Sequence, residues 1–303
     1  MRKEIEQAVA LLGERDPASL EHALELIQGT VFSFSMKVCG QREDAEDTMQ
    51  EVLVKSLPGL PKFESPRALL VWLYKVAKNR CLMSRRRSKF APKPDLSLDQ
   101  LMPDRRQLAQ IASEGPPNPE SLAIRSQEAR RLREAVQRLP PQYRIVLVLR
   151  DMEGLTDEEV GEITGLRPGT ARVRLHRARL FVRKALNDHR EATRGPKAHR
   201  APAAAEAPPA HSRAGSCKAL FAQLSNYLDD QLDDSMCEEL EKHLDGCEPC
   251  RAFLSSLERS IQQCRAVAAE SPDPGLAARL RRDLLLEYRR LMERITEQSS
   301  TAS

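Results

Sequence analysis

Apolar side chains recur at helical spacing along most of this chain, and Pro and Gly fall between the periodic segments. In residues 170–186, for example, the apolar positions share one helical face: Ala171, Leu175, Ala178, Val182 and Leu186. No segment shows the apolar–polar alternation that is typical of a half-buried strand. The pattern therefore predicts an all-α protein.

Two Pro-rich segments interrupt the helical pattern. Residues 88–120 hold six prolines, and residues 187–216 hold four prolines and nine alanines with almost no large apolar side chain. Such a composition cannot build a core and is typical of linkers. We therefore expect helical domains at 1–90 and 121–187, linkers at 91–120 and 188–216, a small helical domain at 217–264 and an amphipathic helix at 275–298.

Charge is distributed unevenly along the chain, although the net charge is only +4. Residues 71–90 carry seven Lys/Arg and no acid, residues 167–190 carry eight against one acid, and residues 217–264 carry ten acids against four bases. Two basic segments and one acidic module predict contact with nucleic acid and a segment that can compete for it.

The composition also bears on location and on the cysteines. No apolar run approaches the roughly 20 residues that a membrane span needs, and the charged N-terminus is unlike a signal peptide, so we expect a cytoplasmic protein with no membrane contact. Seven cysteines in a reducing compartment indicate metal or redox chemistry rather than a disulfide framework. We expect Cys39 and Cys81 to be buried as small hydrophobic residues.

The segment "LTDEEVGEITGLRPGTARVRLHRARLFVRKAL" predicts a helix-turn-helix. Thr156 and Glu159 have the spacing of a capping box, and Gly165 can end the first helix in the left-handed conformation. The second helix begins near Thr170, and its basic residues fall opposite its apolar face, free to reach a major groove: Arg172, His176, Arg177, Arg179 and Arg183. A solvated basic helix is the alternative interpretation.

The first domain pairs an acidic amphipathic segment, "QREDAEDTMQEVLVKSL", with the basic segment "PRALLVWLYKVAKNRCLMSRRRSK". Followed by a Pro-rich spacer and a helix-turn-helix ending in "RLHRAR", this order resembles the extracytoplasmic-function (ECF) sigma factors of bacterial RNA polymerase. The resemblance covers about residues 30–87 and 121–186. It implies a non-catalytic protein that directs core RNA polymerase to promoter DNA.

The resemblance also implies roles for individual positions. Residues docking on the largest polymerase subunit would be Asp44, Glu46, Asp47, Gln50 and Glu51. Residues that melt and read the promoter near the start, or follow its backbone, would be Trp72, Lys75, Lys78, Asn79, Arg80, Arg85, Arg86 and Arg87. Residues reading the farther upstream element would be Thr170, Arg172, Arg174, His176, Arg177 and Arg179. Met83 stands where the family usually has an acid, and Ala171 where it usually has a β-branched residue, so the promoter sequence is left open.

The third domain contains "HLDGCEPC", in which His243, Cys247 and Cys250 have the spacing of metal ligands. His243 and Cys247 lie four residues apart on a helix, and a following turn lets Cys250 reach the same point. Structural zinc needs a fourth ligand. Cys237 should point elsewhere, since six residues correspond to about 120° around a helix, whereas Cys217 begins a preceding helix that can fold back. A redox pair without metal is the alternative, but no strand precedes "CEPC".

The segments "LSNYLDDQLD" and "HLDGCEPCR" resemble the zinc-containing anti-sigma domains. This resemblance favours one zinc on Cys217, His243, Cys247 and Cys250, in a module that docks on the sigma domains of its own chain. Whether the module inhibits, activates or only stabilises stays open, as do packing of the last helix on the sigma domains, packing on its own module and a coiled coil. The rival functions are an ordinary helix-turn-helix transcription factor and a zinc-dependent scaffold.

Overall fold

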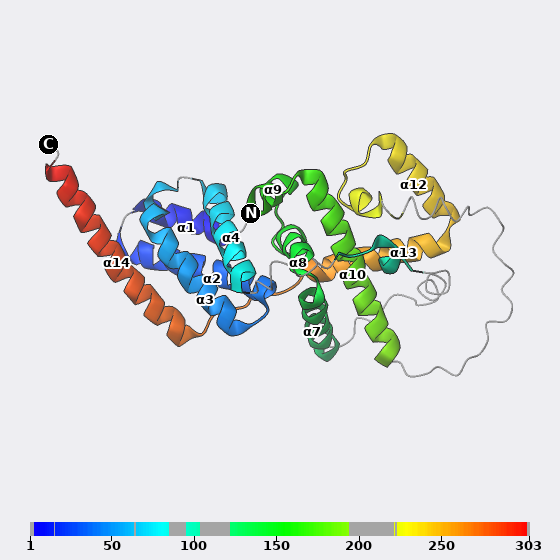
Figure 1. The fold of residues 1–303 in the computed structure, drawn as a ribbon, viewed down its shortest axis with the longest axis horizontal. Helices are drawn as coiled ribbons and strands as arrows, with labels where there is room; N and C mark the ends of the chain where they lie inside the picture. The colour runs from blue at the N-terminus through cyan, green and yellow to red at the C-terminus, as the bar shows by residue number, and fades with distance from the viewer. Residues whose placement is uncertain are drawn as a thin grey trace. The chain divides into compact units, whose positions relative to one another are not determined.

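The computed structural model describes residues 3–14, 16–63, 65–84, 95–103, 122–193, 221 and 223–301. Throughout these residues the regular elements are helical, which confirms the predicted all-α fold (Figure 1). The chain forms two compact units. Unit 1 contains residues 1–93, 144–168 and 267–303, and unit 2 contains residues 94–143 and 169–266. The boundaries of these units differ from the domain boundaries expected from the sequence. The two helices of the helix-turn-helix, for example, belong to different units.

Unit 1 is built on a bundle of its first four α-helices. Asp16 caps α2 by accepting hydrogen bonds from the backbone N–H groups of Ala18 and Ser19, and Gly40 ends it at φ 78°. The left-handed conformation suits a glycine at this position. The elements of the bundle are α1 (Lys3–Glu14), α2 (Pro17–Cys39), α3 (Arg42–Ser56), η1 (Leu57–Lys62) and α4 (Pro66–Ser84). Their fully buried side chains include Leu24, Ile27, Phe32, Phe34, Met49, Leu53, Leu69 and Tyr74.

A buried polar cluster joins this bundle to residues 144–168 within unit 1. The carboxylate of Glu153 accepts hydrogen bonds from Lys37 Nζ at 2.7 Å and from the Tyr74 hydroxyl at 2.6 Å. Arg144 Nη1 donates to the carbonyl oxygen of Val38 at 2.8 Å. The cluster precedes α9 (Asp157–Thr164), which packs against α4. Because the charges are paired, their burial is tolerated.

The C-terminal helix α14 (Pro274–Thr301) belongs to unit 1 and packs against α2, α3 and η1 (Figure 1). Its buried residues Ala277, Leu280 and Leu284 follow helical spacing. The buried amide of Gln28 donates to the carbonyl oxygen of Ala277 at 3.2 Å and accepts from Arg281 at 3.1 Å. Of the three placements left open by the sequence, the structure therefore has this helix on the first sigma-like domain.

Unit 2 combines the second helix of the helix-turn-helix with the acidic module. Its helices are α5 (Leu98–Leu101), α7 (Leu122–Arg138), the start of α8 (Pro141–Leu147), α10 (Pro168–Thr193), a helical segment at 223–228, α12 (Asp234–Gly246) and α13 (Glu248–Arg265). Helix α10 continues six residues beyond the predicted domain end at 187. One apolar cluster includes Leu101, Leu180, Phe221, Leu224, Leu240, Leu244, Cys250, Phe253, Leu257 and Ile261.

Cys39 and Cys81 correct one prediction from the sequence. Both are buried, as expected, but they are joined by a disulfide that links α2 to α4. No local pattern signals this bond, because the two residues lie 42 positions apart and each matches the apolar face of its own helix. The expectation that these two cysteines are simple packing residues is therefore wrong.

Candidate nucleic-acid interface and metal centre

The predicted reading helix forms as α10, after the capped helix α9. Thr156 Oγ1 accepts a hydrogen bond from the backbone N–H of Glu159, and the Glu159 carboxylate accepts one from the Thr156 N–H at 2.9 Å. Gly165 ends α9 at φ 74°. Local chemistry alone therefore specifies where the first helix begins and ends, as the sequence predicted. Thr170, at the start of α10, is exposed, and Arg172 and Arg174 are half-buried.

Arg179, a predicted DNA contact, is buried in this conformation. Its two terminal nitrogens donate to the two carboxylate oxygens of Asp229 at 2.7 and 2.9 Å. The side chains of Arg179 and Asp229 are only 1% and 10% exposed. A bidentate pair of this kind is strong and directional. The guanidinium group therefore binds a carboxylate inside unit 2 and is not exposed to a ligand.

Two neighbouring residues of α10 are also engaged within unit 2. His176 Nδ1 lies 2.8 Å from Ser225 Oγ, in the helical segment that precedes α12. Arg177 Nη1 donates to both carboxylate oxygens of Asp95, at 3.1 and 3.3 Å, and the hydroxyl of Tyr143 donates to the same carboxylate. The acidic module and the segment around Asp95 thus meet the basic side of α10 from two parts of the sequence.

Burial changes the protonation chemistry of this face. Burial lowers the pKa of His176 from the usual 6.5 of a histidine to about 4, and the positive charges of Arg179 and Arg177 add to the shift. Burial also lowers the pKa of Arg183 to about 10, while its guanidinium group lies 4.1 Å from the centre of the Phe253 ring. Ser225 of the acidic module contacts His176, and Phe253 of the same module covers Arg183. At neutral pH the buried His176 is therefore neutral.

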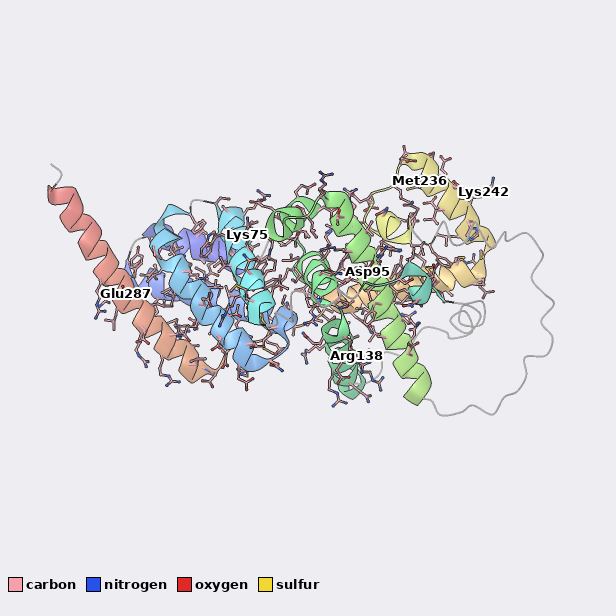
Figure 2. All side chains as sticks on the ribbon, in the orientation of Figure 1. Lys75, Asp95, Arg138, Met236, Lys242 and Glu287 are labelled. Atoms are coloured by element: carbon pink, nitrogen blue, oxygen red, sulfur yellow. A yellow bond between two sulfur atoms is a disulfide. The ribbon has the colours of Figure 1, made fainter. Side chains whose placement is uncertain are left out.

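Of the predicted promoter contacts on helix α4, some are exposed to solvent and others are buried inside unit 1. Lys75 (Figure 2) and Asn79 are exposed, and half-buried Trp72 lies 5.9 Å from Phe63, ring centre to ring centre. Lys78 is buried and donates to the carbonyl oxygen of Ile163, at the end of α9, at 2.7 Å. Burial lowers the pKa of Lys78. Arg85, Arg86 and Arg87 lie outside the described residues.

The acidic residues predicted to contact polymerase lie along α3. Asp47 and Gln50 are exposed, whereas Asp44, Glu46 and Glu51 are half-buried. Glu51 accepts from Lys55 at 2.6 Å and pairs with Arg80 of α4 at 2.8 Å. The hydrogen bond from Lys55 and the charge of Arg80 lower the pKa of Glu51. Glu51 therefore connects the acidic face of α3 to the basic face of α4.

The junction of α12 and α13 brings three potential metal ligands together. Extended backbone at Cys247 (φ −131°, ψ 92°) ends α12 and begins α13. As a result His243, in the last turn of α12, and Cys250, in the first turn of α13, face the same point as Cys247. The three ligand atoms lie within 4.8 Å of one another, and Cys237 is not a member of this group among the described residues. Cys217 lies outside the described residues.

The geometry of this group fits a tetrahedral metal. His243 Nε2 lies 3.3 Å from Cys250 Sγ. Zinc held at about 2.0 Å from nitrogen and about 2.3 Å from sulfur would separate two such ligands by about 3.5 Å. Met236 and Lys242 lie on the same helix, α12, outside this group (Figure 2). The donor set is therefore suited to one metal ion.

Three residues that contact the basic face were missed at the sequence level: Asp95, Ser225 and Asp229. Asp229 lies inside "LSNYLDDQLD", the segment singled out for its resemblance to anti-sigma domains, but nothing local to it identifies Arg179 as its partner. The two residues lie 50 positions apart. Only the fold brings such a pair together.

Three family models match the chain. The model for sigma-70 region 2 matches residues 24–90, and the model for region 4 matches residues 129–182. A model described as "Putative zinc-finger" matches residues 217–251. The first two matches contain α4, all of α9 and the first 15 of the 26 residues of α10, and the third contains the His243–Cys250 group. Among the helices that the structure describes, none combines the length and apolar character that a membrane span requires.

Similar proteins agree with these matches. The chain is 27% identical over 191 residues to the ECF RNA polymerase sigma factor SigW of Bacillus subtilis, covering 62% of this chain and 100% of the relative. It is 30% identical over 179 residues to the ECF RNA polymerase sigma factor SigD of Mycobacterium tuberculosis, covering 56% and 77%. It is 30% identical over 152 residues to the sigma factor YlaC of Bacillus subtilis, covering 50% and 83%. The chain therefore belongs to the ECF RNA polymerase sigma factors and carries a fused C-terminal module of the zinc-finger anti-sigma type.

Proposed function

We propose that this chain directs core RNA polymerase to promoters and is restrained by its own C-terminal module. In this proposal the acidic face of α3 docks on the polymerase, the exposed residues of α4 melt the promoter, and α10 reads the upstream element. The observation that carries the restraint is the buried pair between Arg179 of α10 and Asp229 of the module. A guanidinium held by both oxygens of a buried carboxylate cannot contact a base edge or a phosphate at the same time.

The apolar contacts of the module support the same proposal. Leu180 of α10 belongs to the apolar cluster that also contains Phe253 and Leu257 of α13. Docking therefore buries apolar surface beside the ion pair, and burial of apolar surface is the main favourable term in such contacts. Removal of the module from α10 would expose both the Leu180 side chain and the basic face.

The last helix, α14, supports a second restraint within unit 1, on the proposed polymerase-docking helix α3. Helix α14 packs against α2 and α3, and α3 carries the residues proposed to dock on the polymerase. Arg42, at the start of α3, donates to the carbonyl oxygen of Ser271 at 3.2 Å while its Nε pairs with Glu46. A partner that approached the N-terminal end of α3 would have to compete with these contacts.

We also propose that one structural zinc ion is held by Cys217, His243, Cys247 and Cys250. The ion would fix the α12–α13 junction, and its three thiolates and one neutral imidazole would carry a net charge of −1 with the metal. We expect Cys217→Ser to lose the zinc and Cys237→Ser to retain one zinc per chain. Metal analysis of the purified proteins checks this, and zinc retained in Cys217→Ser but lost in Cys237→Ser would reassign the fourth ligand.

Acid should weaken the docking of the module through His176. Its pKa is about 4 when docked, against 6.5 for an unperturbed histidine, so the undocked form binds a proton at higher pH. Docking is then fully favourable above pH 6.5 and is lost progressively as the pH falls toward 4, by about fourfold between pH 7.5 and pH 6. We expect an NMR titration of the full-length protein to give His176 a pKa near 4. A value near 6.5 would contradict the docked arrangement.

Charge reversal at the exposed residue Asp47 tests the polymerase-docking face. We expect Asp47→Lys to reduce binding to core RNA polymerase strongly, because a like charge in a complementary interface costs several kcal/mol. Glu6→Lys, an equal charge change on α1, is the matched control and should bind normally. Copurification with core polymerase measures both, and normal binding of Asp47→Lys would remove α3 from the docking surface.

A further inference from the structure

The Cys39–Cys81 disulfide lies at the end of the helix to which promoter melting is assigned. Cys39 is the last residue of α2, and Cys81 follows Arg80 near the end of α4. The two residues beyond Cys81, Leu82 and Met83, are exposed. The bond therefore attaches the final part of α4 to the bundle next to exposed Asn79 and half-buried Arg80.

The surroundings of the bond connect it to α3 as well as to α2 and α4, and α3 and α4 carry the proposed polymerase-docking and promoter-melting surfaces. Thr48 of α3 is buried, and its hydroxyl lies 3.9 Å from the sulfur of Cys39 and 3.8 Å from that of Cys81. One turn away on the surface, Arg80 of α4 pairs with Glu51 of α3. This half-exposed ion pair is worth little, whereas the covalent bond ties the end of α4 directly to α2.

We propose that this disulfide is a redox switch for promoter melting, an inference that rests on the melting role proposed for α4. Proteins that work beside DNA in a compartment of reduced thiols seldom keep permanent disulfides, and those that form there are usually transient or redox-sensing. The oxidised form holds the end of α4 in place, so its promoter contacts are preorganised. The reduced form leaves that end attached only through noncovalent contacts.

The exchange is balanced with a dithiol as reductant and a peroxide as oxidant. A thiolate of the dithiol attacks one sulfur of the bond and releases the other as a thiolate, and the second thiol of the reductant then resolves the mixed disulfide. Two electrons and two protons convert Cys39 and Cys81 to thiols while the dithiol becomes a disulfide. In the reverse direction a peroxide oxidises one thiolate to a sulfenic acid, and the other thiol displaces water to re-form the bond.

Both sulfur atoms are buried, so exchange requires a local opening of the bundle. The side chains of Cys39 and Cys81 belong to residues that are 0% and 3% exposed. The position of Cys39 at the very end of α2 favours such an opening, since helix ends fray more readily than helix centres. Because this opening precedes attack, we expect reduction to be slow in the folded protein and faster when the bundle is loosened.

Two measurements on the full-length protein test the switch independently of its transcriptional role. The first is mass spectrometry after thiol alkylation, with the protein equilibrated in dithiol–disulfide buffers of increasing reducing strength. We expect reversible conversion between disulfide and dithiol, with a fall in melting temperature on the order of 10 °C on reduction, since the bond closes a loop of 42 residues. A pair that stays oxidised in the most reducing buffer would be a permanent structural bond and would overturn the proposal.

The second measurement separates melting from every other step. Run-off transcription is compared for oxidised and reduced protein on a duplex promoter and on the same promoter with the start region already unpaired. We expect reduction to cause a loss of transcription on the duplex and none on the unpaired template. The double variant Cys39→Ala/Cys81→Ala should no longer respond to redox conditions, whereas Cys237→Ala, a change at a free cysteine, should respond like the wild type.

The outcomes are distinguishable. Equal transcription by oxidised and reduced protein on both templates would overturn the switch, and so would an equal loss on both. Absence of transcription from either template under every condition would instead reject the melting role on which the inference rests, and with it the proposed control of melting.

Discussion

Asp229→Ala is expected to raise the affinity of the full-length protein for promoter DNA at least about tenfold. The substitution leaves the guanidinium of Arg179, whose side chain is 1% exposed, without the carboxylate that holds both of its terminal nitrogens. Removing one partner of a buried ion pair typically costs about 3–5 kcal/mol, because the remaining charge is buried and uncompensated. The docked form bears this cost, whereas the undocked form, in which Arg179 reaches solvent or DNA, does not.

Fluorescence anisotropy with a labelled duplex that contains the upstream element measures this change. Glu239→Ala is the matched control, since it removes the same charge from an exposed position of α12 in the same module. It should leave DNA affinity nearly unchanged, which excludes a purely long-range effect of the module's net charge. Equal affinity of the wild type and Asp229→Ala would show that the Arg179–Asp229 pair does not limit access to α10.

Local chemistry explains why parts of this molecule could be predicted from the sequence. The capping box of Thr156 and Glu159 spans four residues, and the group of His243, Cys247 and Cys250 spans eight. Interactions of this range depend on helical geometry alone, which a sequence specifies directly. The helical periodicity predicted the all-α fold for the same reason, and the structure confirms it.

Tertiary contacts explain what the sequence could not supply. Arg179 and Lys78 are cationic positions for which the sequence indicated only solvent or DNA, yet their partners are Asp229 and the carbonyl oxygen of Ile163. Burial of a cation depends on whether a distant segment supplies an acceptor, and no local pattern encodes that acceptor. The Cys39–Cys81 bond was missed for the same reason, because it joins two helices that each satisfy an ordinary apolar pattern.

In the proposed account, the pairing of these cations also explains how one surface serves both DNA binding and restraint. Arg177 and Arg179 are paired with Asp95 and Asp229, and DNA phosphates are the competing anions. An acidic partner supplied by the same chain does not have to be recruited from solution, so it competes at a high effective concentration. In the proposed account, promoter binding therefore has to overcome an intramolecular competitor, and any event that loosens the module favours DNA.

Removal of the module is expected to produce the largest change in activity. A protein ending at Thr193, the last residue of α10, lacks Asp229, Ser225 and Phe253, which contact Arg179, His176 and Arg183. It also lacks α14, which packs against α2 and α3. With both contacts gone, the proposed polymerase-docking face and the proposed reading helix are free together, so the effect should exceed that of Asp229→Ala alone.

Run-off transcription with core RNA polymerase, comparing the full-length protein with the protein ending at Thr193, tests the central claim most directly. Circular dichroism of the truncated protein first verifies that its helices and cooperative unfolding are retained. The account predicts that the truncated protein supports more transcription than the full-length protein at equal concentration, and that Asp229→Ala in the full-length protein lies between them. Equal or lower transcription by a folded truncated protein would contradict restraint and would make the C-terminal module a passive or activating part of the sigma factor.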